Sequence, residues 1–208
     1  MPFIFSDEVF AVFDIATLEG RMAAIKEQVQ PIFRHYGAVV TEQLADKMMP
    51  IHVAKHLRRT VHPPETTWVG IGGDKRGYKK YAHFQLGINE EYVFMMLAII
   101  DNPPTRVAMA TQLLDKLALL ERLPDDFAVI PDHTDIAYIA QPRAHYSELL
   151  TQLRNKRKAE FMVGRILHKG DAILQEEAEL ERWIRQTISA LQEIYELLLK
   201  VEPQTQHI

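Results

Sequence analysis

Apolar residues recur at steps of three and four through the first part of the chain, which is the spacing of one helical face. Ser6 and Thr17 precede helical patterns and are predicted N-caps, the first of a short helix that reaches Phe13. Pro31 lies inside the second pattern and predicts a bend or break there. The apolar stripe of this second helix consists of Leu18, Met22, Ile25, Val29, Ile32 and Tyr36.

The pattern changes near Pro50. A helix is expected over about Thr41 to Met49, ending before this proline. Short segments follow that alternate or are rich in β-branched and aromatic residues, as strands are. The last two are predicted to form an antiparallel hairpin whose second strand, apolar throughout, is buried on both faces. The predicted strands are residues 51–56, 66–71, 83–88 and 92–100.

Two of these strands place histidines on one face by alternation. The apolar residues of the same strands are expected on the opposite face, toward the core. A sheet face of histidine, glutamine and small residues is expected to line a cleft. The residues of this face are His52, Ala54, His56, His83, Gln85 and Gly87.

Helices and strands both occur in the second half of the chain. The predicted helices are residues 105–122, with Thr105 as cap, 145–155 and 171–201, and the predicted strands are 127–130 and 159–168. Gly164 is expected to mark a bulge or a close approach, and residues 204–208 a frayed tail. Helices on both sides of a run of antiparallel strands predict an α+β fold. We expect a single antiparallel or mixed sheet covered by helices, with a long C-terminal helix, and residues 1–208 as one domain.

The composition is that of a globular protein, with 47% apolar and 25% charged residues. The chain contains no cysteine, which excludes disulfides, thiolate metal sites and a cysteine nucleophile. The N-terminus has no basic secretory region, and the longest apolar run, Tyr92 to Ile100, is far shorter than the roughly 20 residues that span a membrane. A soluble, cytoplasmic protein with no membrane contact is therefore expected.

Positive charge concentrates between Ile51 and His83. Seven cations stand there against Glu65 and Asp74, so that the local charge is +5 (seven minus two) in a chain whose net charge is −4. This asymmetry, with interleaved histidines and glycines, predicts a site for a small phosphate- or carboxylate-bearing ligand. The alternative is that the cations keep sheet edges and loops soluble. The predicted ligand-binding residues are His52, Lys55, His56, Arg58, Arg59, Arg76, Lys79, His83 and Gln85.

The triplet Asp132-His133-Thr134 follows a predicted strand and offers a general base, His133, with Asp132 as its orienting carboxylate. His56 is a second candidate base. An Asx-type turn is the alternative interpretation of the triplet. His52 and His56 would chelate one metal ion on a helix, but along a strand they lie about 13 Å apart at roughly 3.3 Å per residue. No metal site is therefore predicted.

Binding of RNA or single-stranded DNA is a further alternative, because aromatic residues interleave with the cations: Trp68, Tyr78, Tyr81 and Phe84. The negative net charge disfavours a protein that coats nucleic acid with its whole surface. The sequence contains no P-loop, nucleophile elbow, dinucleotide fingerprint or kinase signature. It therefore names neither a cofactor nor an oligomeric state.

A long stretch of the basic segment resembles the signature of the YktB-like family of uncharacterised bacterial proteins. The matching parts are residues 52–64, Thr67-Trp68-Val69, residues 75–80 and 83–87, joined by Phe10-x-x-Phe13, Leu18-Glu19-x-Arg21-Met22, Asp132-His133-Thr134 and Lys158-Ala159-Glu160. The resemblance covers nearly the whole chain. It implies a single α+β domain of unknown function around an antiparallel sheet, akin to the class II synthetase and biotin-ligase core. By analogy this kinship suggests a cleft for a phosphorylated or adenylated ligand, but it assigns no catalytic residue.

Overall fold

The fold is built on one open antiparallel sheet. A computed structural model describes residues 2–44 and 49–201 of the chain. The strands follow the order β1-β2-β3-β4-β7-β5-β6, and every neighbouring pair is antiparallel. Their bounds are β1 Ile51–Val53, β2 Thr66–Ile71, β3 His83–Asn89, β4 Tyr92–Ile99, β5 Phe127–Ile130, β6 Ile139–Ala140 and β7 Phe161–His168.

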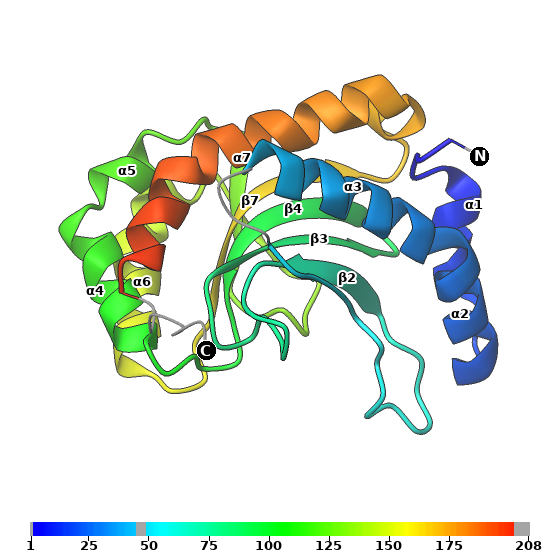
Figure 1. Cartoon of the computed structure of the whole chain (residues 1–208), viewed down its shortest axis with the longest axis horizontal. Helices are drawn as coiled ribbons and strands as arrows, with labels where there is room; N and C mark the ends of the chain where they lie inside the picture. Colours follow the sequence, from blue (N-terminus) through cyan, green and yellow to red (C-terminus); the bar gives the residue numbers. More distant parts are fainter. Residues whose placement is uncertain (1, 45–48, 202–208) are drawn as a thin grey trace.

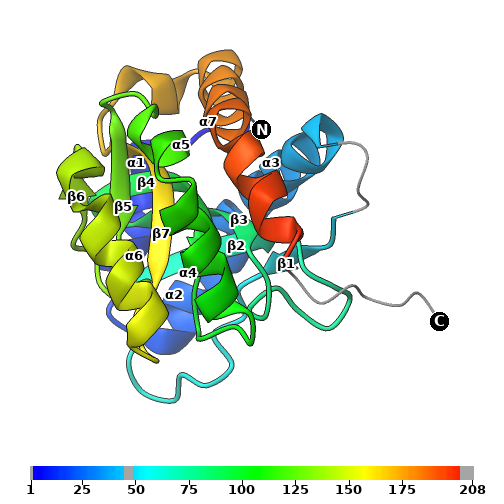
Figure 2. The same ribbon diagram turned by 90° about the vertical axis from the view of Figure 1, so that its left-hand side faces the viewer.

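Helices cover one face of this sheet. The long helices α3 and α7 lie across it, and α4 and α6 pack against each other beside β7 (Figures 1 and 2). The helices are α1 Asp7–Phe10, α2 Leu18–Ala24, α3 Gln30–Gln43, α4 Arg106–Asp115, α5 Ala118–Glu121, α6 Tyr146–Asn155 and α7 Glu177–Leu199. The predicted α+β architecture with a long C-terminal helix is confirmed. None of the helices described is long and apolar enough to cross a membrane.

Alternation along the strands divides the buried residues between two clusters. In β3, Phe84, Leu86 and Ile88 enter the large core beneath the helices, as predicted. The opposite sheet face carries a smaller cluster that includes Phe94 and Met96 of β4. Since both faces are covered, all eight residues of β4 are buried, and the prediction of a doubly buried strand is confirmed.

Glycine allows the central strands to pack closely. A Cβ at Gly164 of β7 would lie 2.0 Å from the carbonyl oxygen of Met95 in β4. That separation is far below van der Waals contact, so any side chain there would push the two strands apart. The predicted close approach at this glycine is confirmed.

The N-terminal helices follow the predicted pattern in part. Thr17 caps α2 through its hydroxyl, which accepts a hydrogen bond from the Gly20 N–H at 3.3 Å, whereas Ser6 makes no such bond. The break expected near Pro31 is a π-helical turn, Ile25–Val29, in which the Gln30 N–H bonds to the carbonyl five residues back. Because proline has no N–H to continue the helical ladder, the chain restarts as α3 with Pro31 in its first turn.

Other predicted boundaries are wrong. The helix expected over 105–122 is interrupted at Lys116 and forms α4 and α5, and the Thr105 hydroxyl makes no cap bond. The last helix begins at Glu177 rather than near Asp171, since a 3-10 turn, Ala172–Gln175, comes first. The Phe5 N–H donates to the Leu174 carbonyl at 3.0 Å and ties this turn to the N-terminal segment. Tertiary contacts of this kind have no local sequence signal.

Some predictions fall elsewhere. The helix expected over 41–49 is partly the end of α3, and residues 45–48 lie outside the described residues, as does the predicted tail at 204–208. The short edge strand β6 was not predicted. Strands β5 and β7 and helix α6 lie where the pattern placed them.

We predict that Gly164→Ala lowers the free energy of unfolding by roughly 1–3 kcal/mol, because the new methyl group overlaps the Met95 carbonyl. Urea denaturation of the two proteins measures the change. Leu57→Ala serves as the control, since Leu57 is 84% exposed and should change stability by no more than about 0.5 kcal/mol. An unchanged midpoint in Gly164→Ala would contradict the packing argument.

Candidate functional site

A cavity of about 480 Å³ opens on the sheet face opposite α3, beside β2. Its walls come from the loop after β1, the loop before β3 and the loop after β5. Lys55, Arg58, Arg59 and Lys79 supply positive charge, and Glu65 is the acidic residue of the lining. The lining also includes the rings of His56, Trp68, Tyr78 and His133 and the side chains of Ala54, Leu57, Thr66 and Thr134. Cations and rings from separate segments therefore meet in one concave place.

Five of the nine predicted ligand-binding residues line this cavity: Lys55, His56, Arg58, Arg59 and Lys79. The candidate base His133 lines it as well. His52, Arg76, His83, Gln85 and the candidate Asp132 lie outside its lining. The predicted ligand-binding residues thus fall into two groups, one that lines the cavity and one that lies outside it.

Tyr78 divides the two groups. Its ring lies over Gly70, where a Cβ would come within 2.8 Å of ring carbons. It also contacts the rings of His52 and His83, at centroid distances of 5.6 and 4.6 Å. The indole N–H of Trp68 donates to the Tyr78 hydroxyl at 2.7 Å and fixes the ring in this position. Tyr78 is therefore a cavity wall with the predicted polar face behind it.

His83 and Gln85 are fully buried behind this wall, at 0% and 1% exposure. The His83 Nδ1 lies 3.0 Å from the Tyr81 carbonyl and its Nε2 lies 3.3 Å from the Gln85 side chain. Burial lowers the pKa of His83 to about 4. The parity predicted for this strand is right, but the side chains are neutral supports in the apolar interior, and the expectation that they line a cleft is wrong.

His56 departs from the predicted strand. Strand β1 ends at Val53, and His56 has a left-handed backbone with φ 49°. Its Nε2 lies 3.0 Å from the Thr67 hydroxyl, and its ring meets Trp68 edge to face at 5.4 Å. Burial, helped by the charge of Arg59, lowers the pKa of His56 to about 4. The ring is neutral near pH 7, and its hydrogen bond holds the cation-bearing loop against β2.

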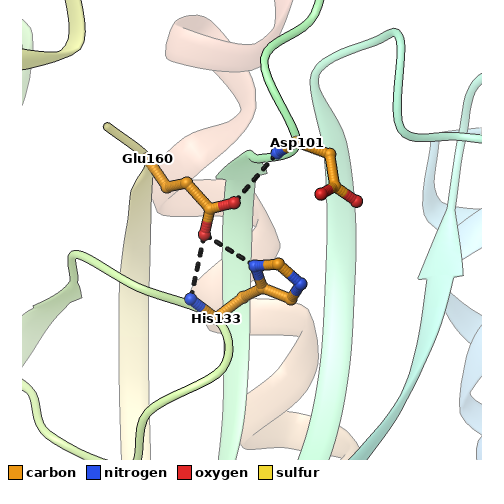
Figure 3. A group of neighbouring side chains, drawn as sticks. All are labelled: Asp101, His133 and Glu160. Atoms are coloured by element: carbon orange, nitrogen blue, oxygen red, sulfur yellow. Dashed lines mark hydrogen bonds and ion pairs between the residues drawn. The ribbon is translucent and has the colours of Figure 1, made fainter. Parts of the chain in front are cut away.

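His133 lies on the other side of Trp68, with ring centroids 5.7 Å apart. Its Nδ1 is 2.7 Å from Oε2 of Glu160, and the same oxygen accepts the His133 backbone N–H at 2.9 Å. The second oxygen, Oε1, accepts the backbone N–H of Asp101 at 2.9 Å (Figure 3). A carboxylate with three hydrogen bonds thus fixes the imidazole, and within residues 2–44 and 49–201 no hydrogen-bond partner occupies Nε2.

The partner predicted for His133 was wrong. The Asp132 carboxylate bonds the backbone N–H and the hydroxyl of Thr134, at 2.8 and 2.6 Å, and this pairing holds the pKa of Asp132 below its usual range. The Asx-turn alternative therefore describes Asp132. Glu160 takes the orienting role from a position 27 residues away in sequence, so no local spacing could have revealed it.

Asp101 is not among the site residues predicted from the sequence. Asp101 follows β4, and both Asp101 and Asn102 have φ 56°. This left-handed backbone conformation is free of strain in glycine and costs less energy in asparagine and aspartate than in other residues. The conformation points its N–H at Glu160, while its carboxylate pairs with the ammonium of Lys79. The end of β4 is therefore shaped around the His133–Glu160 pair.

Arg76 belongs to a tight turn outside the cavity. The Asp74 carboxylate accepts the Tyr81 hydroxyl at 2.7 Å and the backbone N–H groups of Arg76 and Gly77, which keeps the pKa of Asp74 low. His52 bonds the Asp74 carbonyl at 2.9 Å. These bonds build the loop that carries Tyr78.

We predict that stability falls as the pH drops from about 6.5 toward 4. Burial lowers the folded-state pKa of His83 and His56, so in this window the unfolded chain binds protons that the folded chain does not. Each histidine contributes at most about 1.4 kcal/mol per pH unit. Urea unfolding as a function of pH should show a shallower slope for His83→Gln than for wild type. The matched control His62→Gln replaces an exposed histidine and should keep the wild-type slope; equal slopes in all three proteins would refute the assignment.

Known proteins are similar in sequence to this chain over nearly its whole length. The family model described as a domain of unknown function, DUF1054, matches residues 5–195. A UPF0637 protein of Enterococcus faecalis is 39% identical over 197 residues, covering 93% of this chain and 97% of the relative. UPF0637 proteins of Oceanobacillus iheyensis and Listeria welshimeri are 36% and 37% identical, covering 94% of this chain and 96% and 98% of the relatives. The resemblance to YktB-like proteins is thus confirmed, and the chain belongs to the DUF1054 family of UPF0637 proteins.

Proposed function

We propose that the protein binds a small molecule bearing a phosphate or carboxylate group in the cation-lined cavity. The observation that carries this proposal is the convergence of Lys55, Arg58, Arg59 and Lys79 on one hollow of about 480 Å³. That volume lies within the roughly 300–1,000 Å³ of small-molecule sites. The alternative, that the cations only keep loops soluble, does not account for their facing one cavity.

Three of the four cations are available to a ligand. In the part of the chain that the structure describes, no ion pair joins Lys55, Arg58 or Arg59 to an acidic side chain. Guanidinium groups bind phosphate and carboxylate through paired hydrogen bonds, which are stronger than neutral ones. An anion in the cavity would therefore gain contacts that do not first require breaking internal bonds to these three residues.

The aromatic rings of the cavity suit a ligand that has an organic body beside its anionic group. Trp68 and Tyr78 give the cavity an apolar wall, fixed by their mutual hydrogen bond, against which an organic body can pack. Tyr78 is buried and Trp68 half-buried, so they form a wall rather than an open platform for successive bases. The site fits a small organic anion better than a nucleic-acid strand.

An enzyme acting on this anion is a second candidate function. The observation in its favour is His133, which lines the cavity, is held by Glu160 and has no hydrogen-bond partner at Nε2 among the residues described. Of the other catalytic candidates, the base candidate His56 bonds Thr67, and Asp132, predicted as an orienting carboxylate, bonds Thr134. His133 is therefore the residue on which chemistry at the bound anion would depend.

The binding proposal predicts that pyrophosphate or a nucleoside phosphate binds the wild-type chain and that Arg58→Ser/Arg59→Ser weakens binding by more than about tenfold, since each charge-assisted hydrogen bond contributes about 1.5–3 kcal/mol. Isothermal titration calorimetry in a chelator-containing buffer measures the affinity. Lys75→Ser/Arg76→Ser is the matched control, because it removes the same charge from a neighbouring turn that does not line the cavity.

Equal losses in the two double variants would show that general charge attracts the anion, and no heat with any anion at millimolar concentration would end the proposal. Tighter binding of an oligonucleotide, falling steeply with salt, would replace it by nucleic-acid binding.

The enzyme candidate predicts that turnover of a ligand found in this way drops by roughly 100-fold or more in His133→Gln. Product formation is followed by chromatography, and ligand affinity by calorimetry on the same variant. Asp132→Asn should keep most of the activity, because the Asp132 carboxylate bonds Thr134 in the neighbouring turn and makes no hydrogen bond to the His133 ring in the described part of the chain. Wild-type turnover in His133→Gln would exclude the histidine from the chemistry while leaving the binding proposal intact.

A further inference from the structure

We propose that Asp101, His133 and Glu160 form a binding site for a divalent metal ion at the edge of the cavity. One potential ligand atom of each residue lies within 4.8 Å of the other two. The three come from separate segments, after β4, after β5 and before β7, and their side chains turn toward one another (Figure 3). Such convergence of an imidazole and two carboxylates gives the donor types that bind zinc and manganese.

The hydrogen bonds assign a role to each residue. Glu160 holds His133 Nδ1 at 2.7 Å, which leaves Nε2 as the nitrogen available to a metal. A metal-binding histidine typically has its other ring nitrogen held by a carboxylate in this way. The two carboxylates lie to either side of the ring (Figure 3). Nε2 of His133 and the carboxylate of Asp101 are therefore the direct ligands, and Glu160 orients the ring from its Nδ1 side.

The charges at this place favour a cation. Asp101 and Glu160 carry two negative charges, and the ion pair of Asp101 with Lys79 offsets one of them. This pair contributes little free energy, since the two side chains are 37% and 49% exposed to solvent. The ammonium of Lys79 already occupies the cation position beside Asp101, and a divalent ion would displace it toward the cavity.

Backbone geometry supports the assignment independently. With φ 56°, the backbone N–H of Asp101 donates to Glu160, while the Asp101 carboxylate is partly exposed to solvent. Conformations of this kind persist where the surrounding structure enforces them and gather at functional sites. The ion would thus enter at an exposed carboxylate and meet a ring fixed in advance.

The inference goes beyond the proposed anion site and does not depend on it, because the metal is tested alone. We expect the metal-stripped full-length protein to bind Mn²⁺ saturably, at one ion per chain, in electron paramagnetic resonance titrations, with Zn²⁺ competing. Asp101→Asn, an isosteric change at a backbone position that asparagine tolerates, should weaken binding more than about tenfold, and Glu160→Gln by roughly 10- to 100-fold. Lys79→Met should strengthen binding, because it removes the competing ammonium.

Asp125→Asn is the matched control, since Asp125 is likewise a surface carboxylate paired with a cation, Arg143, and should leave Mn²⁺ affinity unchanged. Circular dichroism establishes that each variant is folded. Absence of saturable binding in both wild type and Lys79→Met would overturn the site, as would equal affinity in Asp101→Asn and wild type. Pyrophosphate binding, measured with chelator present, reports on the anion proposal separately.

Discussion

Burial of β4 on both faces is the constraint from which the rest of the structure follows. A strand that is apolar throughout must be covered twice, and the helices α3 and α7 cover only one side of the sheet. The outer residues of β4 cluster instead with Tyr78 from the loop between β2 and β3 and with Ile136 and Tyr138 from the loop after β5. Tyr78 also lies on Gly70 of β2, and His83 and Gln85 of β3 are buried behind it. The cavity begins where this cover ends, beside Trp68. Its position is therefore a consequence of how the core is closed.

The sequence predicted features whose causes are local. Alternation identified both faces of β3, the apolar run identified the doubly buried β4, and the composition of residues 51–83 identified the region that forms the cavity wall. Among single residues the result was mixed. Lys55, Arg58, Arg59 and Lys79 reached the cavity, whereas His83 and Gln85 did not, because alternation fixes the side of a sheet but cannot tell whether a loop will cover it.

The pairing of His133 with Glu160 could not be predicted from the sequence, for a different reason. Its nearest carboxylate in sequence, Asp132, is drawn into the turn by Thr134, while the effective partner comes from the start of β7. Only the order β4-β7-β5 brings the residues flanking these strands, Asp101, His133 and Glu160, to the same end of the sheet. Such a cluster depends on the topology of the whole sheet, which no local pattern encodes. Antiparallel neighbours place the end of one strand beside the beginning of the next, and this explains why the three residues meet.

Lys79 connects the two proposed sites. It lines the cation cavity and also pairs with Asp101, so it can satisfy an incoming anion or the carboxylate, but its single charge is shared between them. An anion that draws Lys79 into the cavity leaves Asp101 with unbalanced negative charge, and a metal ion at Asp101 releases Lys79 to the anion. By thermodynamic linkage the two effects are equal, so each ligand raises the affinity for the other by the same factor. The proposed metal and anion sites would therefore act as one unit. When the metal ion binds Asp101, the ammonium of Lys79 leaves that carboxylate and pairs with the anion in the cavity.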